Sequence, residues 1–157
     1  ITHFAKERGI IVTIETEGSH FLQTDYPLDL ISLSPKFSNS VPVVGAVTPQ
    51  GAIADEKMIK QHNKFRINKD AIRQTLDYHT DYHFKPVWDG TDENLAEIEA
   101  CRVEMESPKD KTYVMPAGDT RETLIEMYPL VFEMCAEHGY NMTGRDHIIA
   151  YDTKREV

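Results

Sequence analysis

The chain has 157 residues and a formal net charge of −9, with hydrophobic residues at 40% and charged residues at 27%. These values are typical of one globular domain, and no apolar run approaches the roughly 20 residues of a membrane helix. The acidic charge argues against nucleic-acid binding, because proteins that bind phosphates carry a basic face. A small-molecule ligand or a protein partner is therefore expected.

The N-terminal part of the chain predicts the end of a helix and two strands. Residues 1–9 form the helix end, with Gly9 as its stop signal. Residues 10–18, IIVTIETEG, are rich in β-branched side chains and predict a strand. Residues 28–36, LDLISLSPK, predict a second strand closed by Pro35, and its apolar run indicates burial on both faces, as in a parallel sheet.

Turn residues dominate the stretch from about 37 to 65, which we expect to be a loop-rich insert. A loop of this length inside a compact domain is typical of a functional or mobile segment. Residues 52–65 predict a short helix within the insert. Asn68 is placed to cap the next helix, over 69–80.

Strands and helices continue to alternate toward the C-terminus. The predicted elements are a strand over 82–90, a helix from Thr91 or Asp92 to about Glu106, a strand over 111–118, a helix over 121–139 capped by Thr120, and a short strand over 144–152. Pro129 is expected to bend or break its helix. This alternation predicts an α/β fold of parallel βα units. Five strands are too few for an eight-stranded barrel but match its second half, or most of an open sheet.

Polar or conformationally flexible residues follow each predicted strand. In parallel α/β folds, ligands bind at the carboxyl ends of the strands. The residues expected there are Glu15 to Ser19, Ser34 to Lys36, Asp89 and Gly90 at the end of a strand that contains Lys85, Met115 to Asp119, and Arg145 to His147. They predict a rim for a polar, carboxylate-bearing ligand. The same residue types also end strands that carry no site, because turns require them.

The two cysteines, Cys101 and Cys135, lie far apart in helical patterns. They predict buried free thiols and a protein of the reducing cytoplasm. The pair His79 and His83 spans a loop-like segment, so no metal site is expected there.

Four stretches, in this order, resemble the 7-carboxy-7-deazaguanine synthase family of radical S-adenosylmethionine enzymes. They are IVTIETEG (11–18), with Glu-Thr-x-Gly; LISLSPK (30–36), with Ser-Pro-Lys; YVMPAG (113–118), with a Gln-Pro-like turn; and GRDHIIAYDTKREV (144–157), with Arg-x-His. Each motif alone is unspecific. The ordered set covers nearly the whole chain and carries the resemblance.

The resemblance implies that residues 1–157 form the C-terminal portion of a single, incomplete TIM-like barrel domain. It implies a carbon–nitrogen lyase that converts 6-carboxy-5,6,7,8-tetrahydropterin to 7-carboxy-7-deazaguanine in queuosine and deazapurine biosynthesis. Its cofactors would be S-adenosylmethionine, a [4Fe-4S] cluster and Mg²⁺. The partner would be a small pterin rather than nucleic acid or a membrane, and a homodimer is compatible with the resemblance.

Matching positions imply the site residues. The cofactor-binding residues would be Ser34, Pro35, Lys36, Met115, Pro116, Ala117 and Gly118. The substrate-pocket residues would be Glu15, Gly18, His147 and Val157, the last as the natural C-terminus.

The chain also departs from the family pattern. It lacks the three-cysteine motif, and without three thiolates it cannot hold the cluster. Met115 stands where the family usually has glutamine, and Tyr151, Asp152 and Glu156 also differ, which leaves the exact substrate open.

Two interpretations follow. The chain is either part of a radical enzyme cut short upstream of Ile1 or a non-catalytic half-barrel module that binds a ligand or another chain. An α/β-hydrolase is not supported, because the sequence contains no Gly-x-Ser-x-Gly motif.

Overall fold

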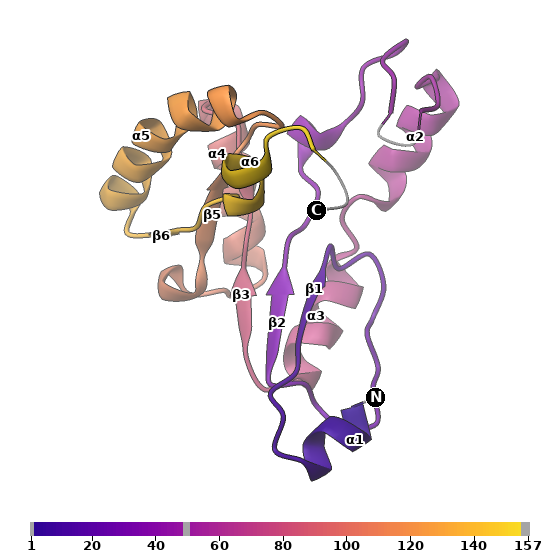
Figure 1. Cartoon of the computed structure of the whole chain (residues 1–157). Helices are drawn as coiled ribbons and strands as arrows, with labels where there is room; N and C mark the ends of the chain where they lie inside the picture. Colours follow the sequence, from indigo (N-terminus) through magenta and orange to yellow (C-terminus); the bar gives the residue numbers. More distant parts are fainter. Residues whose placement is uncertain (1, 49–50, 155–157) are drawn as a thin grey trace.

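A computed structural model of the chain describes residues 2–48 and 51–154, and Figure 1 shows its elements. In chain order these are α1 (Thr2–Glu7), β1 (Thr13–Thr16), β2 (Leu30–Leu33), the 3₁₀ turn η1 (Ser38–Ser40), α2 (Glu56–Phe65), α3 (Lys69–Tyr78), β3 (Tyr82–Phe84), β4 (Val87–Trp88), α4 (Asp92–Glu104), the 3₁₀ turn η2 (Lys109–Lys111), β5 (Tyr113–Pro116), α5 (Arg121–His138), β6 (Asn141–Met142) and α6 (Asp146–Tyr151).

The named strands pair in parallel, so the predicted α/β fold is confirmed. They form one sheet in the order β1-β2-β3 and a second in the order β4-β5-β6, and a bridge between Phe84 and Thr112 connects the two. The predicted strand 82–90 is divided at Pro86. The amide of Lys85 still donates to Leu33 of β2 at 2.7 Å, whereas the carbonyl of Pro86 accepts from Met115 of β5 at 2.9 Å. The segment changes partner there because proline has no amide hydrogen for the first ladder.

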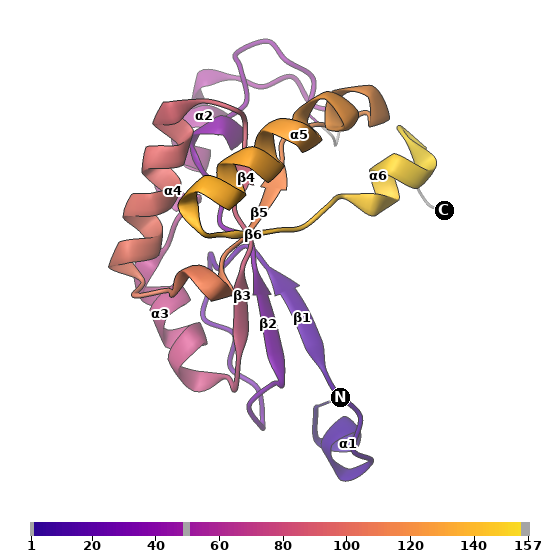
Figure 2. The same cartoon turned by 90° about the vertical axis from the view of Figure 1, so that its left-hand side faces the viewer.

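The helices α3 and α4 cover one face of the sheet β1-β2-β3, as Figure 2 shows. Successive side chains of a strand point to opposite faces, so Ile31 and Leu33 face these helices and Ser32 faces away. Ile31, Leu33, Ile72 of α3, Ile98 of α4 and Val131 of α5 are all fully buried. Each buried aliphatic side chain of this kind contributes about 1.5–3 kcal/mol to folding. The core therefore lies between the sheets and the helices. Ser32, on the other face, is also buried, so β2 is buried on both faces as its apolar run predicts.

The predicted helix boundaries follow local chemistry. The side chains of Asn68, Thr91 and Thr120 each accept a hydrogen bond from the amide three residues later, which confirms all three N-caps. Gly139 ends α5 in the left-handed conformation, with φ of 73°. Pro129, which is expected to bend or break this helix, does not break it, because α5 continues through it. Pro129 is exposed, and buried side chains on the opposite face hold the helix on the sheet.

The predicted strand over 144–152 is also wrong. The last strand is Asn141–Met142, and Asp146–Tyr151 is the helix α6. The adjacent Ile148 and Ile149 favour a strand by local propensity, but tertiary contacts decide. The guanidinium of Arg121 on α5 donates to the carbonyls of Ile149 and Ala150 at 2.6 and 2.9 Å. A helix end supplies such free carbonyls, so this contact stabilises α6.

The insert between 37 and 65 contains the expected short helix, α2, which Asp55 caps. Glu97 of α4 anchors both ends of the insert. One carboxylate oxygen accepts from the amide of Ser38 at 2.9 Å, and the other accepts from Arg66 at 2.8 Å. Desolvation by burial raises the pKa of Glu97, but these donors outweigh it and hold the pKa below its ordinary value. Between the anchors, Val47 and Ile53 form an antiparallel bridge with exposed side chains.

Both cysteines are buried free thiols, as expected: Cys101 lies in α4 and Cys135 in α5. Burial raises the pKa of each thiol to about 11, so neither is a thiolate at neutral pH. Within residues 2–48 and 51–154, the longest apolar stretches of helix fall short of what a membrane crossing requires.

The histidine at the end of α3 holds the loop between β1 and β2. His79 is buried, with 7% of the residue exposed, and its Nδ1 accepts from the amide of Leu28 at 3.0 Å. Its Nε2 therefore carries the hydrogen and donates to the carbonyl of Leu22 at 2.9 Å. The neutral ring thus satisfies two backbone groups that lie more than 50 residues away in sequence.

We predict that His79→Leu lowers the free energy of unfolding by about 2–3 kcal/mol, because the buried amide of Leu28 and the carbonyl of Leu22 lose their partner. Urea unfolding at pH 7 measures the effect. His20→Leu is the control, since His20 is exposed and contacts only Ser19 among its hydrogen-bonding partners in the described residues. Equal stability of the two variants would contradict the role of His79.

Candidate functional site

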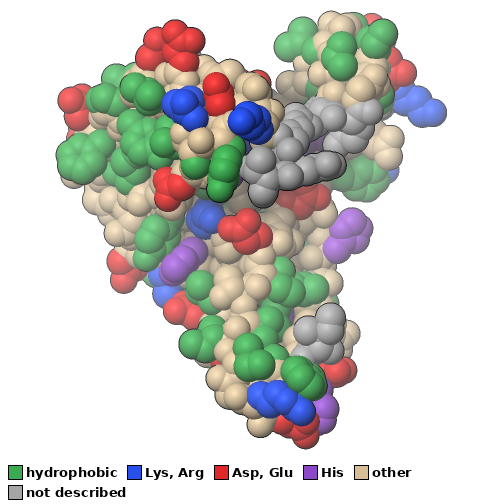
Figure 3. Space-filling view, viewed as in Figure 1, with side chains coloured by type: hydrophobic (Ala, Val, Ile, Leu, Met, Phe, Trp, Pro, Cys, Tyr) green, Lys and Arg blue, Asp and Glu red, His purple; other side chains and the backbone are tan. Residues whose placement is uncertain are grey.

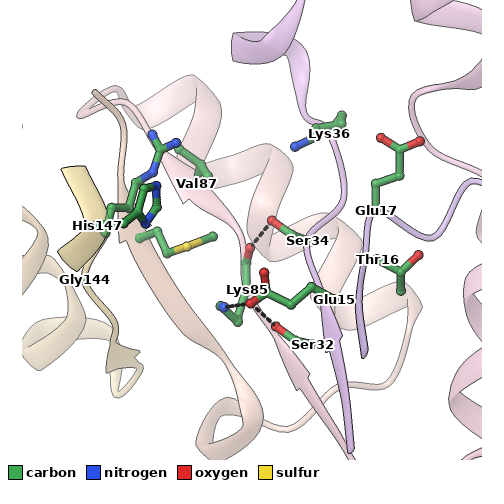
Figure 4. A pocket seen from close by; sticks show the side chains of 12 residues that line it. Glu15, Thr16, Glu17, Ser32, Ser34, Lys36, Lys85, Val87, Gly144 and His147 are labelled. Atoms are coloured by element: carbon green, nitrogen blue, oxygen red, sulfur yellow. Dashed lines mark hydrogen bonds and ion pairs between the residues drawn. The ribbon is translucent and has the colours of Figure 1, made fainter. Parts of the chain in front are cut away.

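A cavity of about 550 Å³ lies on the sheet face opposite α3 and α4, at the carboxyl ends of the strands. Figure 3 looks onto this face and shows basic and acidic side chains next to one another near its centre. The lining residues are Glu15, Thr16, Glu17, Ser32, Ser34, Lys36, Lys85, Val87, Met115, Gly144, Arg145 and His147. In Figure 4, His147 lies on one side of the cavity and Glu17 on the other, with Glu15 and Lys85 between them.

A second cavity of about 490 Å³ adjoins the first, because Lys36, Val87 and Arg145 line both. Its other lining residues are Pro35, Phe37, Asn39, Ser40, Asp89, Ala117, Gly118 and Asp119. The two cavities together follow the carboxyl ends of β2, β4 and β5, where parallel α/β folds bind ligands.

An ion pair forms part of the floor of the first cavity. Lys85 Nζ lies 2.9 Å from Glu15 Oε1, and the Ser32 hydroxyl donates to the same oxygen at 3.3 Å. The hydrogen bond and positive charge of Lys85 hold the pKa of the Glu15 carboxyl below its ordinary value. Glu15 is therefore an anion at neutral pH. No residue in the described part of the chain donates to its Oε2.

Hydrogen bonds to the backbone fix the strand ends that line the cavities. The Ser34 hydroxyl donates to the carbonyl of Lys85 at 2.9 Å, which ties β2 to β3 where the ladder changes partner. Arg66 donates to the carbonyl of Lys36 at 3.2 Å. Arg145 donates to the carbonyl of Gly118, so the loop before α6 is fixed to the turn after β5. Three separate segments are thus held at one edge of the sheet.

Most of the site residues predicted from the sequence lie together. Glu15, Ser34, Lys36, Met115 and His147 line the first cavity. Pro35, Lys36, Ala117 and Gly118 line the second.

Two predicted residues line neither of the two cavities. Pro116 is buried and pairs with Trp88 in the sheet. Gly18 is buried against Leu33 and Ile72. Val157 lies outside the described residues.

Lys85 and Arg145 also line the first cavity. Arg145 is among the residues expected at the strand ends and belongs to the Arg-x-His stretch, whereas the four sequence stretches assign Lys85 no role. The alternation of side chains along a strand predicts the face of the sheet on which Lys85 lies. It lies two positions before Val87, on the face that the helices leave open. The bond from Arg145 to Gly118 joins positions 27 residues apart, so sequence alone does not reveal it.

Neither the cavities nor any other part of residues 2–48 and 51–154 contains a group of three or more His, Cys, Asp or Glu side chains that could hold a metal ion. Carboxylate, ammonium, guanidinium and imidazole groups instead face one space. This arrangement defines a class of protein: a parallel α/β protein with polar cavities at the carboxyl ends of its strands.

Comparison with curated proteins gives a more particular result. The chain is 30% identical over 156 residues to a 7-carboxy-7-deazaguanine synthase from Halobacterium salinarum, a match that covers 95% of the chain. It spans 57% of that relative's length and corresponds to its C-terminal part. The family resemblance drawn from the four sequence stretches is thereby confirmed. No family model and no solved structure matches the chain.

Packing explains why the Glu-Thr-x-Gly stretch has glycine at position 18. Gly18 has φ of +77°, and a Cβ atom there would lie 2.6 Å from Ile72 Cγ1 and 2.7 Å from Leu33 Cδ1. Both the left-handed backbone and the buried neighbours exclude a side chain.

We predict that Gly18→Ala destabilises the fold by about 1–3 kcal/mol more than Gly45→Ala, because overpacking adds to the backbone strain. Gly45 is a matched control, with φ of +84° and no atom within 4 Å of the added Cβ. Chemical unfolding of both variants provides the comparison. Equal losses would show that backbone strain alone acts at Gly18.

Proposed function

We propose that this chain is the C-terminal part of a 7-carboxy-7-deazaguanine synthase, a radical S-adenosylmethionine lyase of the cytoplasm that acts on 6-carboxy-5,6,7,8-tetrahydropterin. The observation that carries the proposal is the convergence of the family-matched residues on two adjoining cavities. The relative from Halobacterium salinarum supports it, although the chain spans only 57% of that protein. Parallel strands in consecutive order support an incomplete TIM-like barrel of one domain.

The second cavity has a chemistry that fits S-adenosylmethionine. Lys36 and Arg145 provide cations for the methionyl carboxylate, and Asp89 and Asp119 provide acceptors for ribose hydroxyls. The turn of Ala117 and Gly118 allows a ligand to approach the backbone closely. When it is bound with the cluster, S-adenosylmethionine supplies the radical chemistry of the reaction. The residues of this chain bind and orient the two reactants and limit water access between them.

The first cavity fits a pterin with a carboxylate substituent. A pterin ring presents N–H donors, and Glu15 provides an anionic acceptor for them. His147, across the cavity, is placed to hydrogen-bond the substrate, and Arg145 and Lys36 carry positive charge for its carboxylate.

The residues of this chain do not fit the iron–sulfur cluster or a Mg²⁺ ion. The two thiols are buried in helices rather than grouped at the cavities, and both stay protonated at neutral pH. The described part of the chain also has no cluster of carboxylates that would hold a divalent cation.

The complete gene product tests the proposed reaction. After anaerobic cluster reconstitution, we expect it to convert 6-carboxy-5,6,7,8-tetrahydropterin to 7-carboxy-7-deazaguanine in the presence of S-adenosylmethionine and Mg²⁺, with the product identified by mass spectrometry. Ligand binding without turnover would instead support the non-catalytic binding module.

We predict that Lys36→Ala in the complete gene product weakens S-adenosylmethionine binding by about tenfold or more, since a hydrogen bond to a charged group contributes about 1.5–3 kcal/mol. Isothermal titration measures the affinity. Lys57→Ala is the control, because Lys57 is exposed on α2 and lines neither cavity. An unchanged affinity for Lys36→Ala would remove this lysine from the site.

A further inference from the structure

Lys85 is the cation in the floor of the first cavity that neither the sequence motifs nor the family resemblance assigns. It follows the last residue of β3, and its amide completes the ladder to β2 through Leu33. The lysine side chain is only 20% exposed, whereas that of its partner Glu15 is 78% exposed. The carboxylate is therefore the more exposed partner, and Figure 4 shows the ammonium group beside it at the cavity.

Fold stability does not explain this pair. An ion pair with one largely exposed partner contributes about 0–1 kcal/mol, because water screens the attraction and two long side chains lose freedom. The geometry is nevertheless specific. Lys85 and Ser32 both bond Glu15 Oε1, and no described residue donates to Oε2. One oxygen of the carboxylate is anchored while the other is left for a ligand.

We propose that Lys85 is a positioning residue for Glu15: it anchors one carboxylate oxygen at the cavity floor so that the other accepts an N–H donor of the ligand. This inference rests on the proposed function in taking a pterin as that ligand. A flat ligand that covers Glu15 also removes water from the carboxylate. Burial of this kind favours the neutral acid, and an adjacent ammonium opposes it. Lys85 thus keeps the acceptor ionised in the complex, when solvent no longer does.

The other charged groups around Glu15 define its pH dependence. His147 faces it from α6, and the positive charge of this imidazole also lowers the pKa of Glu15, by less than Lys85 does. Glu17, Lys36 and Arg145 line the same cavity. Because the folded pKa of Glu15 is lowered, the ionised form is present above the ordinary pKa and is lost as pH falls through the lowered value. Removal of Lys85 should move this loss upward, toward the ordinary pKa of 4.5.

Carbon-13 NMR of the Glu15 carboxyl in the complete gene product tests the positioning directly. Lys85→Met should raise the pKa of Glu15, and Lys85→Arg should restore the low value. Lys111→Met is the matched control, because Lys111 forms the same kind of pair with Asp81, which lies outside the two cavities. It should raise the pKa of Asp81 and leave Glu15 unchanged. If Glu15 titrates identically in the wild type and in Lys85→Met, the inference is wrong.

Binding of 6-carboxypterin, a stable oxidised analogue of the proposed substrate, separates this role from direct contact. We expect Lys85→Met to bind about tenfold more weakly, and Lys85→Arg to recover most of the affinity. In a Glu15→Gln background, Lys85→Met should add little, since a residue that acts through another shows a non-additive effect. Additive losses would mean that Lys85 contacts the ligand itself and would overturn the positioning role.

The two proposals fail separately. If the wild type binds 6-carboxypterin and Lys85→Met binds it equally well with the same pH profile, the inference fails and the proposed function stands. If the wild type does not bind 6-carboxypterin although Lys85→Met shifts the titration of Glu15, the positioning is supported and the proposed ligand is wrong.

Discussion

Helices cover one face of the parallel sheet, so each strand side chain points either toward the helices or toward the open face. The candidate site lies on the open face because of this alternation. Side chains alternate along each strand, so Ile31 and Leu33 pack on the helices while Ser32 between them faces the opposite side. The apolar set supplies the core and fixes the register, since a shift of one residue would exchange the two faces. The polar set is thereby brought to the open face. Glu15, Ser32 and Lys85 meet there because the register holds their strands in line.

Pro86 determines where Lys85 lies in the site, because the chain changes its pairing partner there. The segment before it pairs with β2 and the segment after it with β5, so one stretch of chain belongs to two sheets. Lys85 sits at this change of partner, and the Ser34 hydroxyl bonds its carbonyl. The same backbone feature that ends one ladder therefore places a cation between two strands and beneath the cavity.

The sequence indicates the elements well where the determinant is local. Asn68, Thr91 and Thr120 cap helices through their own side chains, and Gly139 ends α5 through its own backbone, so their identities suffice. The sequence predicts the wrong structure where a contact with a residue distant in sequence determines the element. The helix around Ile148 depends on Arg121 from another helix, and its two adjacent isoleucines indicate the wrong structure.

The site shows the same difference. Strand ends can be read from glycine, proline and charged residues. Lys36 and His147, which the family resemblance selects among them, line one cavity. Gly18 has the same kind of sequence signal, yet it packs on Ile72 of α3. Whether a glycine after a strand admits a ligand or a neighbouring side chain depends on the helix that folds over it, and no local pattern specifies that contact.

A crystal structure of the complete gene product soaked with 6-carboxypterin would test most directly whether the open-face cavity is the ligand site. The geometry predicts ligand density in the 550 Å³ cavity, with ring N–H groups on Glu15 and His147 opposite. Density elsewhere, for example in the 310 Å³ cavity beside Cys101 and Lys69, would contradict the assignment of this face.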